Sequence, residues 1–155
     1  MSDLTRQEVL EITARARLLL RSNLRYLDLS GAELEGADLR QADLLGANLR
    51  RTQLFEANLS GANLRQADME NANLSGANLS AANLYRANLK GAYLYFADFS
   101  RANLRNANLS WASFERPFEK HSSIEANFYK AEYRADTIWP EGFDPRAAGA
   151  VLVQD

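Results

Sequence analysis

Hydrophobic residues recur at every fifth position from Leu24 to Phe114, a period that fits neither an α-helix nor a flat β-strand. The centre of each five-residue unit is leucine, apart from Met69, Phe99 and Phe114. Alanine stands two residues before the centre in nearly every unit, and a polar residue, most often asparagine or aspartate, lies between them. Two inward positions around one outward position indicate a short extended segment in every unit.

The two variable residues that close each unit predict a turn. Glycine often occupies the second of them, as at Gly31, Gly46 and Gly61. A type II turn needs positive φ at this place, and glycine adopts it without steric cost. A helix is excluded, because residues five apart on an α-helix are offset by about 500° and form no stripe. The chain is therefore expected to bend regularly and to stack its coils as parallel strands.

The unit Ala-(Asn/Asp)-Leu-x-x, seen in residues 57–61 and again in 62–66, resembles the consensus of the pentapeptide-repeat family. The match is continuous over residues 22–116 and resumes in degraded form afterwards. The resemblance implies an all-β solenoid, a right-handed quadrilateral β-helix with four units per coil. Roughly five to six coils are expected, each about 4.8 Å high. The tail from Trp139 to Val151 is similar to the tails of cyanobacterial members of this family.

Both ends of the solenoid are expected to be covered within a single domain, residues 1–155. Thr5-Arg6-Gln7-Glu8 has capping-box spacing, and apolar positions from Val9 to Leu20 predict a helix over residues 5–20. This helix is interpreted as an N-terminal cap, and a membrane-surface helix is the alternative. Repeat centres resume at Phe128 and Tyr133, with Ile138 as a further candidate. The expected segments are the cap (1–21), the regular β-helix (22–116), a loop (117–125), degraded repeats (126–138) and a C-terminal tail or cap (139–155).

Composition excludes most chemistry. The absence of cysteine rules out disulfides and thiolate sites, and the single histidine, His121, is interpreted as a solvated residue of the expected loop. No metal-ligand spacing or phosphate-binding glycine loop is present, so we expect no catalytic residue, cofactor or metal site. The outward asparagines and aspartates are attributed to turn and ladder hydrogen bonds. No signal-peptide-like or membrane-spanning segment is found, which favours the cytoplasm.

The variable positions fall into columns of residues twenty apart, and two columns are candidate partner surfaces. One carries aromatic residues at outward positions, which suit a protein interface, although rings that cover the backbone between coils would give the same pattern. The other is basic and could bind an anion, although neighbouring polar residues make a solvated face the alternative. The aromatic candidates are Phe55, Tyr93, Tyr95 and Phe96, and the basic column comprises Arg25, Arg65, Tyr85, Arg86 and Arg105.

These features predict a non-enzymatic scaffold that binds another protein of unknown identity. We expect a monomer, because both ends are covered, although the tail could pair with a second copy. The family resemblance offers an alternative, in which the protein mimics duplex DNA and modulates DNA gyrase or another topoisomerase. Residues 22–116 carry ten basic and ten acidic residues, whereas duplex DNA has about one negative charge per 1.7 Å. Neither DNA mimicry, nucleic-acid binding nor membrane binding is therefore expected.

Overall fold

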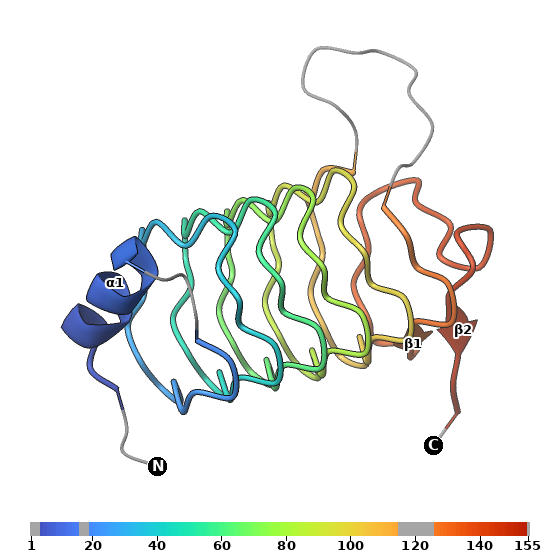
Figure 1. The fold of residues 1–155 in the computed structure, drawn as a ribbon. Helices are drawn as coiled ribbons and strands as arrows, with labels where there is room; N and C mark the ends of the chain where they lie inside the picture. The colour runs from blue at the N-terminus through green and yellow to red at the C-terminus, as the bar shows by residue number, and fades with distance from the viewer. Residues whose placement is uncertain (1–3, 16–18, 115–125, 155) are drawn as a thin grey trace.

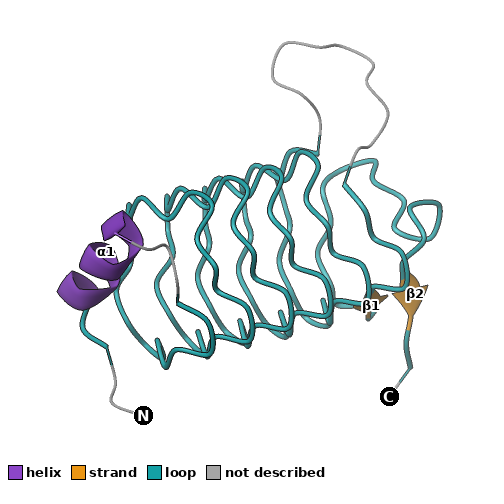
Figure 2. Cartoon of the chain, viewed as in Figure 1, coloured by secondary structure: helices purple, strands orange, loops and turns teal. Residues whose placement is uncertain are grey.

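The computed structural model describes residues 4–15, 19–114 and 126–154, and the chain winds into a rod of stacked coils (Figure 1). Its regular elements are helix α1 (Arg6–Arg15) and two short strands, β1 (Glu132–Tyr133) and β2 (Val151–Leu152). The helix lies at one end of the rod and the β1–β2 pair at the other. Figure 2 draws most of the chain as loop, because the coils are joined by single-residue bridges rather than by long strands.

The register of the coils follows directly from the five-residue period. Each outward residue forms a parallel bridge with the residue twenty positions later, from Asn23 with Asp43 to Tyr93 with Ser113. Four units therefore complete one turn of the solenoid. We call its sides the first, second, third and fourth faces, after the outward residues Asn23, Asp28, Glu33 and Asp38. The predicted quadrilateral β-helix is confirmed.

The turns between faces have the predicted conformation. The N–H of Ala32 donates to the carbonyl oxygen of Leu29 at 3.0 Å, and the intervening Gly31 has a φ of 65°. Among the described residues, fourteen that are not glycine also adopt positive φ, so the ladder imposes this conformation even where the side chain disfavours it.

The interior is filled by the alanine and leucine positions, as the pattern predicts. Leu64 and Leu84 are fully buried one above the other, and their neighbouring alanines are buried as well. Thr52 replaces alanine at one such position. Its hydroxyl donates to the carbonyl oxygen of Leu29 at 2.9 Å, which satisfies the only polar group that this substitution places in the core wall.

The N-terminal cap is shorter than the sequence predicts. Helix α1 ends at Arg15, and Val9 is the residue that it buries completely against the first coil. Leu19 and Leu20, which the sequence analysis placed in the helix, belong instead to the solenoid. The N–H of Leu19 donates to the carbonyl oxygen of Asp38 at 2.8 Å. The physical reason is the period itself, since Leu19 lies five residues before Leu24.

Arg6 replaces part of the missing preceding coil. Its guanidinium donates to the carbonyl oxygens of Asp28 at 2.7 Å and Ser30 at 2.9 Å. One coil further along, the equivalent carbonyls of Asn48 and Arg50 accept backbone N–H groups of the coil before them. The side chain therefore closes the edge that would otherwise be open to pairing with another chain.

We expect Arg6→Met to destabilise the protein by about 1–2 kcal/mol, because two carbonyl groups lose charged donors while the apolar stem and helix propensity remain. Urea-induced unfolding followed by circular dichroism measures the effect. The control is Gln7→Ala on the exposed side of α1, where the side-chain amide donates to the Glu11 carboxylate at 3.0 Å. It should cost no more than about 0.5 kcal/mol. Equal effects of the two changes would show that Arg6 does not cap the edge.

The repeat resumes after the interruption, but with a shifted register. Asn127, Glu132 and Ile138 form bridges with Asp98, Asn103 and Asn108, which are further back than the regular twenty residues. Phe128 and Tyr133 are buried centres, as predicted. The suggestion that Ile138 is a centre is wrong: Ile138 occupies the exposed outward position.

One additional residue before Thr137 explains the displaced register. Thr137 takes the alanine position, and its hydroxyl donates to the carbonyl oxygen of Leu104 at 3.0 Å. Trp139 consequently occupies the position of the centre. The predicted loop at 117–125 lies outside the described residues.

Aromatic rings close the C-terminal end of the core. The ring of Phe128 stacks on Phe99 with centroids 5.1 Å apart and lies edge-on to Phe114 at 5.4 Å. Trp139 and Phe143 cover these rings from the tail, at 5.5 Å and 5.4 Å from Phe128. On the first face, β2 adds a further parallel strand to β1.

Candidate partner-binding surface

Three of the four predicted aromatic residues lie together on the third face. Tyr93 is the outward residue of one coil, and Tyr95 and Phe96 form the turn that follows it. Tyr93 and Phe96 are each 53% exposed, and the rings of Tyr95 and Phe96 are 4.2 Å apart at their centroids. The side chains therefore project into solvent rather than covering the backbone.

Phe55 lies apart from the other three. The N–H of Glu56 donates to the carbonyl oxygen of Ser75, and that of Gly76 to the carbonyl oxygen of Tyr95. Phe55 is therefore two coils below Tyr95 at the same corner, with the small Ser75 between them. It is 41% exposed, so it is accessible, but it does not extend the aromatic group continuously.

Trp111 belongs to this surface, and the sequence analysis did not include it. It is 78% exposed and lies two residues before Ser113, which pairs with Tyr93 across the coils. The N–H of Gly91 donates to the carbonyl oxygen of Ser110, so Trp111 lies one coil beyond Gly91, at the corner between the second and third faces. The sequence does show a tryptophan at this variable position. Because Trp111 follows a centre of the second face, however, the columns of residues twenty apart placed it on the second face. We call Tyr93, Tyr95, Phe96 and Trp111 the aromatic surface.

The backbone of the aromatic surface is strained at two places. Phe96 has a φ of 55° and Trp111 a φ of 62°, the left-handed region that bulky residues avoid. Glycine occupies the same turn position elsewhere, as at Gly76 and Gly91. Twelve other non-glycine residues among the described ones share this conformation, so the strain is a feature of the repeat and does not by itself mark a functional residue.

The basic column is largely engaged within the fold. Arg25 lies 3.6 Å from Asp43, and Arg105 forms an ion pair with Glu132 at 3.0 Å. The remaining members, Arg65 and Arg86, lie over the ring of Tyr85 at 5.7 Å and 5.1 Å from its centroid. The structure thus brings Arg65, Tyr85 and Arg86 together and directs the two end arginines to carboxylates.

The outward asparagines and aspartates form a structural ladder, as predicted. One oxygen of Asp28 accepts the N–H of Ser30 at 3.0 Å and the side-chain amide of Asn48 in the next coil, also at 3.0 Å. The backbone N–H of Ser30 holds the pKa of the Asp28 carboxyl below its ordinary value, with the Asn48 amide as a smaller cause. These groups therefore serve turns and coil stacking.

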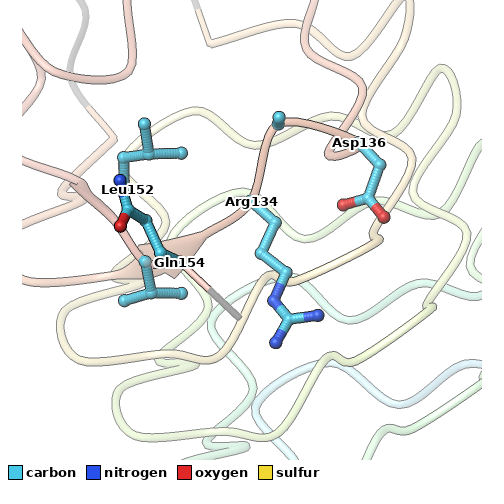
Figure 3. Close-up of a pocket in the computed structure, with 6 residues that line it drawn as sticks. Arg134, Asp136, Leu152 and Gln154 are labelled. Carbon is cyan, nitrogen blue, oxygen red and sulfur yellow. The ribbon is translucent and has the colours of Figure 1, made fainter.

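A hollow of about 420 Å³ lies at the corner that follows β1 (Figure 3). Arg134 and Asp136 extend from one segment, and Leu152 and Gln154 come from the segment that contains β2. Asp136 accepts a hydrogen bond from the side-chain amide of Asn106, and the Arg134 N–H donates to the Thr137 hydroxyl at 3.1 Å. Within the described residues, no group of three or more His, Cys, Asp or Glu side chains could hold a metal ion. His121 lies outside those residues.

Comparison with protein families agrees with this architecture. The sequence profile of pentapeptide repeats matches residues 19–54, 52–91 and 82–116, in eight copies. The chain belongs to the pentapeptide-repeat family. The profile begins at Leu19, where the structure also places the first coil.

Solved pentapeptide-repeat structures are similar to this one. A protein from the Arabidopsis thaliana thylakoid lumen is 30% identical, with 68% of this chain and 73% of that chain covered and a TM-score of 0.64. A protein from the cyanobacterium Cyanothece 51142 is 27% identical, with 86% and 98% covered and a TM-score of 0.51. A search of curated proteins gives no match. The cyanobacterial resemblance is thus confirmed for the repeats.

Pentapeptide-repeat proteins are in general structural or interaction proteins rather than enzymes. The described part of this member has no helix with the length and apolar character needed to cross a membrane. The surfaces that distinguish it are therefore those formed by its variable positions.

Proposed function

We propose that this protein is a non-enzymatic scaffold that binds another protein through the aromatic surface. The observation that carries the proposal is the exposure of three large aromatic side chains, Tyr93, Phe96 and Trp111, on and beside one face of the rod. Aromatic residues are the side chains that most often anchor protein interfaces, because they bury much area at little entropic cost. The rigid ladder beneath them holds the rings in place before binding, which lowers that cost further.

DNA mimicry fits the charge distribution of the rod poorly. The carboxylates of Asp68 and Glu70 both accept hydrogen bonds from Arg50, and Asp38 forms an ion pair with Arg40 at 2.7 Å. Acidic groups that are neutralised within the same face cannot present the dense negative charge of duplex DNA. A protein partner that uses apolar contacts is consistent with the aromatic surface.

We expect Tyr93→Asn to reduce capture of the partner at least about tenfold, the loss of roughly 1.4 kcal/mol. Asparagine stands directly below at Asn73, so the variant restores the usual ladder residue and should remain folded. Affinity capture from the native source, quantified by mass spectrometry, measures the effect. Tyr85→Ser on the first face is the matched control and should retain every partner. Unchanged capture by Tyr93→Asn, or equal losses from both variants, would contradict the proposed surface.

We also propose that the protein works in the cytoplasm, as the sequence analysis expects. The Arabidopsis relative comes from the thylakoid lumen, so the compartment needs a direct test. Fractionation of the native source should place this protein with cytoplasmic markers, and recovery with a membrane-enclosed compartment would overturn that location.

A further inference from the structure

The third face ends one coil earlier than its neighbours. Asn127, Glu132 and Ile138 add a further coil to the fourth, first and second faces. The described third-face ladder ends at Ser113. After Trp139 the chain turns across the end of the core, where Phe143 packs on Phe114 with ring centroids 4.7 Å apart. Among the described residues, none forms a bridge to Ser113 from a further coil, and residues 140–143 cross that end without joining the ladder.

The backbone groups at this place are those that a further coil would use. In the coil below, the N–H of Gly91 donates to Ser110 at 2.9 Å, the carbonyl of Ala92 accepts from Ser113 at 3.0 Å, and the N–H of Leu94 donates to Ser113 at 2.8 Å. The equivalent groups are the Trp111 N–H, the Ala112 carbonyl and the Phe114 N–H. No described residue forms a hydrogen bond with any of these three groups.

A groove runs along this edge. One part, of about 500 Å³, is lined by residues 110–112 and 139–141, and a second, of about 300 Å³, by residues 112–114 and 140–143. The two parts share Ala112, Pro140 and Glu141, so they are continuous. Among the described residues that line either part, Glu141 is the only charged one, and it shares the first part with the exposed ring of Trp111.

We propose that this groove binds an extended segment of a partner protein, which adds one parallel strand to the third face and places a lysine or arginine beside Trp111 and Glu141. An added strand supplies the missing donors and acceptors, because one residue bonds both Ala112 and Phe114 as Ser113 bonds the coil below. A cationic side chain there gains the carboxylate of Glu141 and the face of the Trp111 ring. The site shares only Trp111 with the aromatic surface, so it extends the proposed function to a second mode of contact.

The edge leaves little room for side chains of the peptide that point towards the core. Ala112 and Phe114 are buried, and the ring of Phe143 already fills the space above Phe114. The bound segment therefore needs small residues on either side of its basic residue. Lys90 lies one coil below Ser110 and is outside both linings. The positive charge of Lys90 would repel further basic residues of the bound segment, so a segment with a single basic residue fits best.

The test is a titration of the ¹⁵N-labelled full chain with the peptide acetyl-Ser-Ala-Lys-Ala-amide, followed by NMR. Saturable shifts of the Trp111 and Phe114 amides are expected, and amide exchange at Phe114 should slow at least about fivefold. The same peptide with an N-methylated lysine backbone cannot donate to Ala112 and should bind at least about fivefold more weakly. Glu141→Lys should weaken binding of the unmodified peptide by a similar factor.

The proposal is overturned if neither amide shifts, if the N-methylated peptide binds equally well, or if a peptide with glutamate in place of lysine binds as tightly. It is also overturned if sedimentation shows a dimer that protects the Phe114 amide without peptide, because a second copy would then occupy the groove. The titration does not involve Tyr93 or Phe96. A failed titration combined with loss of capture by Tyr93→Asn would thus leave the aromatic surface in place.

Discussion

Phe128→Ala should lower the free energy of unfolding by about 3–5 kcal/mol, the usual cost of deleting a buried aromatic side chain. The ring is fully buried and contacts four other rings: Phe99 and Phe114 from the coils, and Trp139 and Phe143 from the tail. Removing it opens a cavity and deletes two of the ring contacts between the tail and the coils, those of Trp139 and Phe143 with Phe128. Urea-induced unfolding followed by tryptophan fluorescence measures the loss.

The adjacent residue supplies the control for Phe128. Tyr129 projects outward, and its ring lies 5.0 Å from the ammonium group of Lys130. Tyr129→Ala should therefore cost no more than about 1 kcal/mol. If the two variants unfold at the same urea concentration, the aromatic cluster does not hold the C-terminal end of the core.

Leu64→Ala should cost about 2–5 kcal/mol, because the wall around the deleted side chain cannot collapse. The N–H of Leu64 donates to Asn83 at 2.8 Å, and the carbonyl of Asn63 accepts from Leu44 at 2.8 Å, so ladder bonds fix the spacing of three successive coils. The loss occurs in the middle of the stack, where each coil depends on its two neighbours. Denaturant unfolding of the full chain measures it.

Leu45→Ala is the matched control for Leu64→Ala, since the same atoms are removed from a turn position that is only half-buried. We expect a cost below about 1 kcal/mol. An equal loss of unfolding free energy at the two positions would contradict the conclusion that the centres of the five-residue units form the core.

The repeat made most of this fold predictable, because each unit fixes the conformation of the next. The inward positions and the turns of residues 24–114 follow from the period, whereas the register of four units per coil was implied by the family resemblance. The start of the solenoid at Leu19 was missed because its unit lacks the alanine that marks the others. The position of Ile138 was missed because a single additional residue before Thr137 shifts the register, and periodicity cannot locate such an insertion.

The sequence pattern could not predict contacts between different faces or between the helix and the first coil. Arg6 bonds carbonyl groups more than twenty residues away, and nothing in a helix sequence indicates that partner. Trp111 lies beside the third face only because it is a turn residue at the corner between the second and third faces. The columns of twenty correctly grouped Tyr93, Tyr95 and Phe96, and they also included Phe55, which the structure places two coils away.

The central claim is that Phe96 and Trp111 serve partner binding at the expense of local backbone strain. The measurement that tests it most directly is the unfolding free energy of the double variant Phe96→Gly/Trp111→Gly, together with its capture of the partner. Relief of the left-handed strain should keep stability within about 1 kcal/mol of the wild-type value or raise it, while partner capture is lost. A stability loss above about 2 kcal/mol, or full retention of the partner, would contradict the account.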